Sequence, residues 1–346
     1  MPTQPPASPK KLGMADWGDE FFVGSRAERG SQQKIHPWVK PRQKLWLTGA
    51  SGFLGWYVAA AARADWQVVG SYNRHAVAIP GIALQRVDLT DAIALQHAFS
   101  DLQPDAVIHT AALSQPNRCQ ENPALSRAIN VTASVRLAEL CADAGIPFVF
   151  TSSDQVFDGK NAPYRETDPV SPLNLYGAQK AEAEVEIVRR YPQAAVCRMA
   201  LMYGAAPTAP NFLQTFLERI VQGQTLQLFT DEFRTPLSGR DAAAGLLLAL
   251  AKAKGLLQLA GGDRLSRYEM GQIMVEVFDL PASSIQPSRQ ADVPMPAPRP
   301  PDVSADISLA RSLGFAPHSF REELEALQRT GAFAALLAGL PRQDET

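Results

Sequence analysis

The stretch that decides the fold is Thr48-Gly49-Ala50-Ser51-Gly52-Phe53-Leu54-Gly55, which carries a GxxGxxG pattern. It follows a short apolar run at residues 45–47 and precedes residues 56–64, which predict a helix. Glycines at such a junction allow a tight turn, a close backbone approach to a bound group and close packing of helix on strand. The unpaired N–H groups at the start of the helix then form a site for an anion. The pattern alone also occurs in plain strand-to-helix turns, so its setting in the chain matters.

Strands and helices alternate along the chain after this loop. We predict strands at residues 67–72, 82–87, 106–109, 148–150 and 195–197, and helices at 91–101, 124–144 and 176–190. This rhythm predicts an α/β protein built on a Rossmann doubly wound parallel sheet with helices on both faces. At the head of such a series, the glycine loop predicts a dinucleotide site. Its expected contacts are Gly49, Ser51, Gly52, Phe53, Leu54 and Gly55.

The chain divides into three regions by composition. Residues 1–43 are rich in Pro, Lys, Gln and Ser, and we expect a disordered extension that could dock a protein partner through Trp17, Phe21 and Phe22. Residues 44–203 are predicted to form the nucleotide-binding core. Residues 204–346 are predicted to form mainly a smaller, mostly helical substrate-binding part, with possible return segments to the core. Its proline-rich stretch at 281–301 predicts a long irregular surface segment.

The overall composition narrows the class of protein. The formal net charge of the 346 residues is −2, which gives no case for a nucleic-acid or membrane-surface partner. The three cysteines are far apart, which argues against a disulfide framework or a zinc site. No apolar run approaches the ~20 residues of a membrane span. The N-terminus lacks the apolar segment of a secretory signal, so we expect a cytoplasmic protein.

The end of the second strand predicts which dinucleotide binds. It reads Ser71-Tyr72-Asn73-Arg74-His75, without the acid that would accept bonds from a ribose 2′-hydroxyl. Arg74, next to Asn73, can meet a 2′-phosphate, so NADP(H) is favoured over NAD(H). The alternative is that Arg74 is an ordinary surface cation. Asp88 and Leu89 are placed to contact the adenine, although Asp88 or Asp91 could instead cap the next helix.

A YxxxK pair carries the predicted chemistry. Tyr176 and Lys180 are spaced i, i+4, so they share one face of a helix. A nearby ammonium lowers the pKa of a phenol, which would let Tyr176 exchange a proton with a carbonyl or alcohol oxygen. Ser153, at the end of the preceding strand, can orient that oxygen. By contrast, we expect His109 to be a hydrogen-bonded structural histidine.

Here the chain resembles the extended short-chain dehydrogenase/reductase family, and within it the dTDP-4-dehydrorhamnose reductase branch. The resemblance covers roughly residues 45–327. Its most specific motif is Ser152-Ser153-Asp154-Gln155-Val156-Phe157-Asp158-Gly159. Further similar runs are residues 162–168, 172–177, 231–236 and 299–302.

The resemblance implies a catalytic triad of Ser153, Tyr176 and Lys180, and hydride delivery from a reduced nicotinamide to the C4 ketone of a nucleotide-linked deoxysugar. It also implies further contacts, to the cofactor from Thr110, Ala111, Ala112 and Asn130, and to the substrate from Ser114, Asp154, Asn174 and Arg234. Asp154 could equally cap a turn. The family's signature has a tyrosine at the position of Gln155, which leaves the substrate contacts open. Tyr57 follows Trp56 where magnesium-binding relatives have an acid, so we predict no metal site.

Two other functions remain open from the sequence. The chain is also similar to the regulatory β subunit of methionine adenosyltransferase, which shares this fold and binds NADP. The N-terminal extension favours such a partner-binding role, whereas the intact Ser153, Tyr176 and Lys180 favour catalysis. The third possibility is a reductase or epimerase that acts on another sugar or carbonyl compound.

Overall fold

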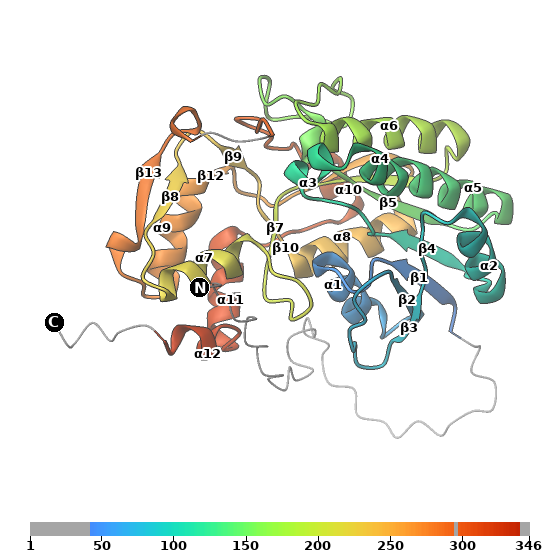
Figure 1. Ribbon diagram of the computed structural model, residues 1–346, viewed down its shortest axis with the longest axis horizontal. Coiled ribbons are helices and arrows are strands. Elements are labelled where there is room, and N and C mark those ends of the chain that lie inside the picture. Colours follow the sequence, from blue (N-terminus) through green and yellow to red (C-terminus); the bar gives the residue numbers. More distant parts are fainter. Residues whose placement is uncertain (1–41, 294–296, 340–346) are drawn as a thin grey trace, which may run out of the picture.

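The structure is a computed structural model that describes residues 42–293 and 297–339. The extension predicted at residues 1–43, with its candidate docking segment, lies almost entirely outside the described residues. In the described part of the chain, a large α/β core lies beside a smaller lobe (Figure 1). None of the helices in this part is long and apolar enough to cross a membrane.

The core is a seven-stranded sheet in which every neighbouring pair of strands is parallel. Its order is β11-β6-β5-β4-β1-β2-β3. The strands are β1 (Lys44–Thr48), β2 (Gln67–Tyr72), β3 (Ala83–Arg86), β4 (Ala106–His109), β5 (Phe148–Ser153), β6 (Ala195–Met199) and β11 (Gly255–Leu259). The chain moves outward from β1 to β3 and then returns to β4 on the other side of β1. Ligands of such sheets bind at this reversal, beyond the carboxyl ends of the strands.

Helices cover both faces of the sheet, which confirms the predicted Rossmann fold (Figure 1). One face carries α1 (Phe53–Ala62), α8 (Gly239–Lys252) and α10 (Ser308–Leu313), and the other carries α2 (Ala92–Leu102), α5 (Ser134–Ala144) and α6 (Leu175–Arg190). Since apolar groups cover both faces, β1, β4, β5 and β6 each contain three consecutive apolar residues. The late segment Gly239–Leu259 therefore contributes a helix and an edge strand to this core.

The helix predicted at residues 124–144 is divided in three. It begins as α4 (Pro123–Arg127), widens into a π-helical turn (Ala128–Ala133) and continues as α5. A short α3 (Pro116–Glu121) precedes it. The π-helical turn contains Asn130, whose buried side chain faces α6 and the loop after β4. Such turns are frequent at functional sites, and no apolar periodicity marks them.

The lobe packs around its own apolar cluster. It comprises α7 (Phe212–Val221), α9 (Arg267–Val277), α11 (Phe320–Arg329), α12 (Ala334–Leu337) and a parallel pair, β8 (Leu226–Phe229) with β13 (Ile285–Ser288). Two-residue strands link it to the core. These are β7 (Met202–Tyr203), β9 (Phe233–Arg234), β10 (Leu237–Ser238) and β12 (Leu265–Ser266).

The prediction of an irregular surface segment at residues 281–301 is wrong in part. The segment holds strand β13 and two 3-10 turns, and Ala297 and Pro300 are buried. Proline is compatible with this strand because β13 lies at the edge of its two-stranded sheet. The proline content identified an unusual backbone, but the local sequence could not show what it pairs with.

Candidate active site

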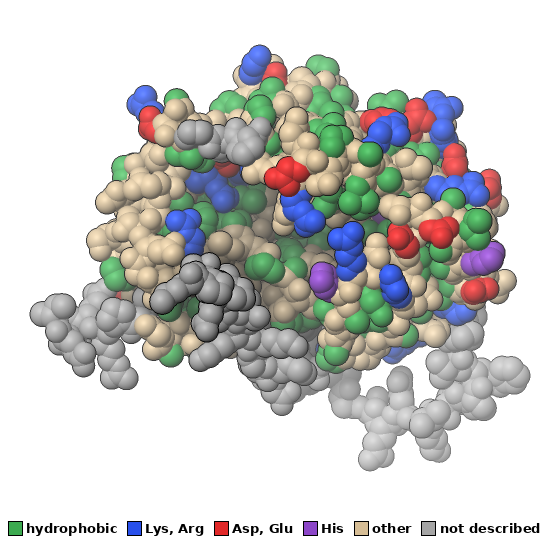
Figure 2. Space-filling model, in the orientation of Figure 1, with side chains coloured by type: hydrophobic (Ala, Val, Ile, Leu, Met, Phe, Trp, Pro, Cys, Tyr) green, Lys and Arg blue, Asp and Glu red, His purple; other side chains and the backbone are tan. Residues whose placement is uncertain are grey.

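A cavity of about 350 Å³ lies at the carboxyl ends of the central strands, where the core meets the lobe. Figure 2 shows a hollow between the two parts of the molecule, with Lys and Arg side chains around it. Thirteen of the residues predicted from the sequence line this cavity. They are Gly49, Gly52, Phe53, Leu54, Gly55, Thr110, Ala112, Ser114, Ser153, Asp154, Tyr176, Lys180 and Arg234.

The glycine loop has the geometry that a dinucleotide needs. Gly49 has φ +72°, and a Cβ there would lie 2.7 Å from the backbone nitrogen of Ala111. A Cβ at Gly55 would lie 2.2 Å from the carbonyl oxygen of Gly49, so helix and strand pack in contact. Gly52 is the N-cap of α1, has no side-chain cap and borders the cavity. The first N–H groups of α1 have no partner within the helix and face space that suits a pyrophosphate.

The three residues of the predicted triad meet at one wall of this cavity. Ser153 ends β5, Tyr176 lies in the first turn of α6, and both line the cavity. One turn further along α6, Lys180 Nζ donates a 2.8 Å hydrogen bond to the carbonyl oxygen of Thr151. Nζ also lies 6.0 Å from the centre of the Tyr176 ring. The start of α6 is fixed by Asn174, whose Oδ1 accepts a 3.0 Å bond from the N–H of Gly177.

The predicted lowering of the Tyr176 pKa is wrong for this structure. Burial raises the pKa of Tyr176 above its usual value, and Lys180 does not offset this effect. Burial also lowers the pKa of Lys180 to about 7. Since both groups are buried together, the loss of hydration outweighs their proximity. At neutral pH the phenol therefore keeps its proton and is available as an acid.

Asp154 is a further ionisable residue that lines the cavity. Its side chain is buried, and burial raises its pKa to about 6 despite the attraction of Arg234. Its Oδ1 accepts a 3.1 Å hydrogen bond from the hydroxyl of Ser153. It also begins a 3-10 turn (Asp154–Val156), which Ser153 caps by accepting from the N–H of Gln155 at 3.2 Å. The cap is thus Ser153, and Asp154 faces the cavity.

The expected substrate contacts Arg234 and Asn174 differ in their position relative to the cavity. Arg234 of β9 lies 3.3 Å from Glu232 and lines the cavity. Asn174 is not among the residues that line the cavity; its Nδ2 donates to Gln155 Oε1 at 3.0 Å and to the carbonyl oxygen of Pro298 at 3.2 Å. Asn174 therefore tethers a late segment of the chain to the start of α6.

The residues expected at the adenosine end lie away from this cavity. Asn73 and Arg74 are exposed at the end of β2. Asp88 accepts bonds from the N–H and hydroxyl of Thr90 at 3.0 and 2.7 Å, and Asp91 caps α2. The capping alternative is thus confirmed for Asp91. Leu89 packs against the core cluster under α2 and α5.

Three further expected cofactor residues lie behind or beside the lining. Asn130 is fully buried, and its amide holds both backbone groups of Leu113, at 2.9 and 3.1 Å. It therefore shapes the loop after β4 from behind. Ser51 and Ala111 lie in the glycine loop and in the loop after β4, next to lining residues.

Sequence reasoning missed several residues around the site. Met199, Ala200, Leu201, Met202 and Asn211 also line the cavity. Residues 199–202 simply continue from β6, whose carboxyl end points at the site, so strand order could have indicated them. Arg86 pairs in register with Tyr72 and donates to the carbonyl oxygen of Asn73 at 3.1 Å, which brings a second cation to the end of β2.

His109 is confirmed as a structural histidine. Its Nδ1 lies 2.5 Å from the hydroxyl of Thr48, and its Nε2 lies 2.9 Å from the hydroxyl of Ser134. Burial lowers its pKa to about 3, so the ring is neutral at ordinary pH. With both nitrogens engaged inside the core, His109 links β1, β4 and the start of α5.

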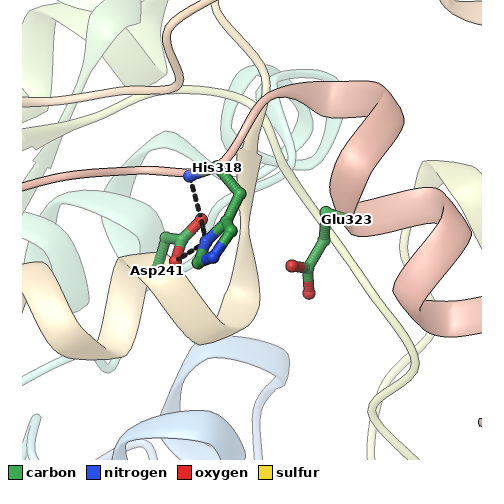
Figure 3. Close-up of side chains that lie close together, drawn as sticks. All are labelled: Asp241, His318 and Glu323. Atoms are coloured by element: carbon green, nitrogen blue, oxygen red, sulfur yellow. Dashed lines mark hydrogen bonds and ion pairs between the residues drawn. The ribbon is translucent and has the colours of Figure 1, made fainter. Parts of the chain in front are cut away.

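Within the described ranges, one group of three possible metal ligands lies close together. The ligand atoms of Asp241, His318 and Glu323 are within 4.8 Å of one another, between α8 and α11 (Figure 3). Asp241 accepts from the backbone N–H of His318 at 2.9 Å and faces its Nδ1 at 3.0 Å. The guanidinium of Arg240 lies 2.6 Å from Glu323 and 3.2 Å from His318 Nδ1. Arg240 thus supplies the cation, and the group joins the core to the lobe by ion pairs.

Tyr57 stands where magnesium-binding relatives have an acidic residue. Its ring is almost fully buried, and its hydroxyl accepts a 2.8 Å hydrogen bond from the N–H of Ala205. A Cβ at Gly239 would lie 2.3 Å from this ring. Tyr57 therefore packs α1 against α8.

Comparison with known proteins identifies the family. The family model described as the RmlD substrate binding domain matches residues 43–332. The β subunit of methionine adenosyltransferase 2 from Bos taurus is 32% identical over 283 residues, covering 79% of this chain and 83% of that protein. A probable low-salt glycan biosynthesis reductase, Agl14 of Haloferax volcanii, is 32% identical over 289 residues, covering 82% and 96%.

Solved structures show the same fold. A dTDP-4-dehydrorhamnose reductase from Bacillus anthracis, solved in complex with NADP, superposes with a TM-score of 0.75 at 20% identity and covers 84% of this chain and 99% of its own. A dTDP-glucose 4,6-dehydratase from Streptomyces venezuelae, with NAD bound, has a TM-score of 0.71 at 23% identity, covering 84% and 96%. The match over residues 43–332 shows that the chain belongs to the RmlD substrate-binding-domain family, on the fold of the extended short-chain dehydrogenases/reductases.

Proposed function

We propose that this protein is an NADPH-dependent reductase of a nucleotide-linked 4-keto-6-deoxy sugar. The observation that carries the proposal is that Ser153, Tyr176 and Lys180 line the same cavity as the glycine loop. A loop that suits a pyrophosphate and a buried phenol that can protonate an oxygen are the two parts that carbonyl reduction requires. The relative Agl14, a probable reductase, supports the same class of chemistry.

Each residue of the site has a distinct task in this proposal. When bound, the reduced nicotinamide supplies a hydride to the carbonyl carbon. Ser153 positions the carbonyl oxygen, and Tyr176, whose raised pKa keeps it protonated, donates the proton that the oxygen gains. Lys180, with a pKa of about 7, is held against β5 by Thr151 and lies beside the phenol. Arg234, at the lobe side of the cavity, is placed to meet an anionic part of the substrate.

The test is turnover on a panel of dTDP- and GDP-linked 4-keto-6-deoxy sugars, followed by the loss of NADPH absorbance. We expect turnover in the wild type and its loss in Tyr176→Phe, because the phenylalanine keeps the packing and removes the proton. Leu173→Ala is a matched control on an exposed side chain near the start of α6. Oxidation of NADPH at equal rates by wild type and Tyr176→Phe would contradict the assignment.

The preference for NADP(H) rests on the end of β2. Arg74 and Arg86 are both exposed there, and the turn carries no acid to accept from a 2′-hydroxyl. Hydrogen bonds from Thr90 are the main cause that lowers the pKa of Asp88, and Arg86 and Arg74 both add to it, so the two cations share one small region. We expect Arg74→Ala to weaken NADPH binding far more than NADH binding, as measured by titration of nicotinamide fluorescence. An equal loss for both nucleotides would rule out a contact with the 2′-phosphate.

A second candidate is an NADP-binding regulatory subunit that acts through a protein partner. It is favoured by the 32% identity to the β subunit of methionine adenosyltransferase 2. Tight NADP binding without turnover on any sugar of the panel would support this function, and co-purification with a methionine adenosyltransferase catalytic subunit would test it directly. Either function suits the proposed cytoplasmic location, since Cys119, Cys141 and Cys197 are all free and buried.

A further inference from the structure

The side-chain amide of Asn174 holds other parts of the protein and has no N–H left for a ligand. Its Oδ1 accepts from the N–H of Gly177 at 3.0 Å, which caps α6 and identifies the oxygen end of the amide. Its Nδ2 donates to the carbonyl oxygen of Pro298 at 3.2 Å and to Oε1 of Gln155 at 3.0 Å. An amide nitrogen carries two N–H groups, so both are used. The substrate contact expected from Asn174 therefore has no free donor.

The same bonds fix the direction of the Gln155 side chain. Because the nitrogen of Asn174 is a donor, Gln155 must meet it with Oε1, and its Nε2 faces the other way. Nε2 has no hydrogen-bond partner in the part of the chain that the structure describes, yet it is not one of the buried polar atoms without a partner, so a ligand can reach it. Gln155 lines the cavity, whereas Asn174 does not. The free N–H groups of Gln155 are thus open to a ligand in the cavity.

We propose that Gln155 is a specificity-determining residue, which donates a hydrogen bond to the sugar hydroxyl next to the reacting carbonyl, and that Asn174 is its positioning residue. The inference rests on the reductase function proposed above and names part of its substrate. Gln155 follows Ser153 by two residues, so their Cα atoms are at most about 7 Å apart. Since Ser153 positions the C4 oxygen in the proposed reaction, Gln155 lies beside the sugar rather than the base. In a 4-keto-6-deoxy hexose, the hydroxyl next to C4 is the one on C3.

The hydrogen bonds of Asn174 also tie this amide to the opposite wall of the cavity. Pro298 lies in the segment that pairs with β9, where the N–H of Phe233 donates to the carbonyl oxygen of Pro301 at 2.6 Å. Arg234, the next residue of β9, lines the cavity from the lobe. The bond from Asn174 to Pro298 therefore holds the start of α6 and the lobe wall in one arrangement around the sugar.

The type of residue at this position is specific to this chain. The family's signature has a tyrosine where Gln155 stands. A tyrosine offers a single hydroxyl, whereas the amide of Gln155 accepts from Asn174 at one end and offers two N–H groups at the other. The bridge and the donor that it holds in place therefore depend on the glutamine.

A comparison of two substrates tests the contact. The substrates are the 4-keto-6-deoxyglucose nucleotide that is turned over, dTDP- or GDP-linked, and its 3-deoxy analogue, and the readout is the ratio of their kcat/KM values. We expect the wild type to prefer the sugar with the C3 hydroxyl by about tenfold, the effect of one hydrogen bond, and Gln155→Met to use both about equally. Methionine keeps the length of the side chain and removes the amide. The matched control Gln120→Met, on an exposed position of α3, should keep the wild-type ratio.

The variant Asn174→Ser tests the positioning role. Serine is a good N-cap for α6 but has no amide to hold Gln155. We expect the ratio of kcat/KM values to fall toward one, while NADPH binding, measured by fluorescence titration, stays as in the wild type. A wild-type ratio in Asn174→Ser would refute the positioning role.

An unchanged ratio in Gln155→Met, whether activity falls on both sugars or on neither, would overturn the contact, because a purely structural role affects both sugars alike. Calorimetric binding to the NADP⁺-loaded protein gives a readout without turnover, with dTDP- and GDP-linked 6-deoxyglucose and their 3-deoxy analogues as probes. Preference for the C3 hydroxyl that is lost in Gln155→Met, without turnover, would refute the reductase and support the contact. Turnover with an unchanged ratio would do the reverse, and neither binding nor turnover would refute both.

Discussion

The buried ion pair behind the active site gives a sharp test of how α6 is held. Arg198 of β6 donates from Nε to Glu184 Oε1 at 3.0 Å and from Nη2 to Oε2 at 2.7 Å. The two side chains are 2% and 4% exposed. The guanidinium also lies 4.9 Å from the centre of the Phe157 ring. We expect Arg198→Met to destabilise the fold strongly, because methionine fills similar space and leaves the Glu184 carboxylate buried without its cation.

The expected size follows from this burial. Removal of one partner of a buried pair costs about 3–5 kcal/mol of unfolding free energy. In the variant, Glu184 retains the hydroxyl of Ser152, which places the loss toward the lower end.

Urea unfolding followed by fluorescence measures the deficit for the wild type, Arg198→Met, Glu184→Gln and the double variant, provided that the transition is two-state. The double variant carries no uncompensated charge, so we expect it to lose less than the sum of the two single variants. A loss below about 1 kcal/mol in Arg198→Met would refute the reasoning, since that value is typical of an exposed pair. Strict additivity in the double variant would refute it as well.

Three further outcomes follow from the structure. Gly55→Ala should weaken NADP⁺ binding at least tenfold in a calorimetric titration, because its Cβ would lie 2.2 Å from the oxygen of Gly49, whereas Gly262→Ala, which meets only a side-chain atom at 3.4 Å, should bind normally. His109 has a pKa of about 3 in the folded state against about 6.5 in the unfolded state, so between these pH values the unfolded state binds more protons and stability rises with pH. On acidification through this window, the wild type should lose about 1.4 kcal/mol of unfolding free energy per pH unit relative to His109→Gln. Parallel plots of unfolding free energy against pH for the two proteins would contradict the buried neutral ring. Asn174→Asp keeps the oxygen that caps α6 but loses both donated bonds, so hydrogen exchange should accelerate around Pro298 with little change at the start of α6, while Asn174→Ala should affect both.

The sequence predicted those parts of the site that depend on local chain geometry. The glycine loop needs Gly49 at positive φ and Gly55 against backbone, and both requirements are visible in a single strand–loop–helix unit. The i, i+4 spacing of Tyr176 and Lys180 is likewise a property of one helix. The alternation of strands and helices then implies the sheet, and its order fixes the edge at which these residues meet.

The parts that failed depend on contacts between distant segments. The sign of the Tyr176 pKa shift is set by burial under the rest of the fold, and the spacing to Lys180 says nothing about that. The proline-rich stretch forms β13 only because β8, about 60 residues earlier by the register Ile285 to Leu226, offers an edge. The contact of Asn174 with Pro298 spans 124 residues. A single sequence carries no local signal for such pairings.

Three residues of helix α6 each contact β5, and this arrangement links the stability of the fold to the position of the candidate catalytic residues. Tyr176, Lys180 and Glu184 follow one another at intervals of four along a single face of the helix. Each meets β5: Tyr176 contacts Ser153, Lys180 contacts the carbonyl of Thr151, and Glu184 contacts Ser152.

The third of these contacts carries no chemistry, yet it anchors the other two. The charge of Glu184 favours the ammonium form of Lys180. The ion pair between Arg198 and Glu184 fixes the rotation of α6 about its axis. A rotation of the helix that released Glu184 would also carry Tyr176 away from Ser153. Loss of the buried ion pair should therefore reduce turnover even in molecules that remain folded, because the same face of the helix sets both the packing and the position of the phenol.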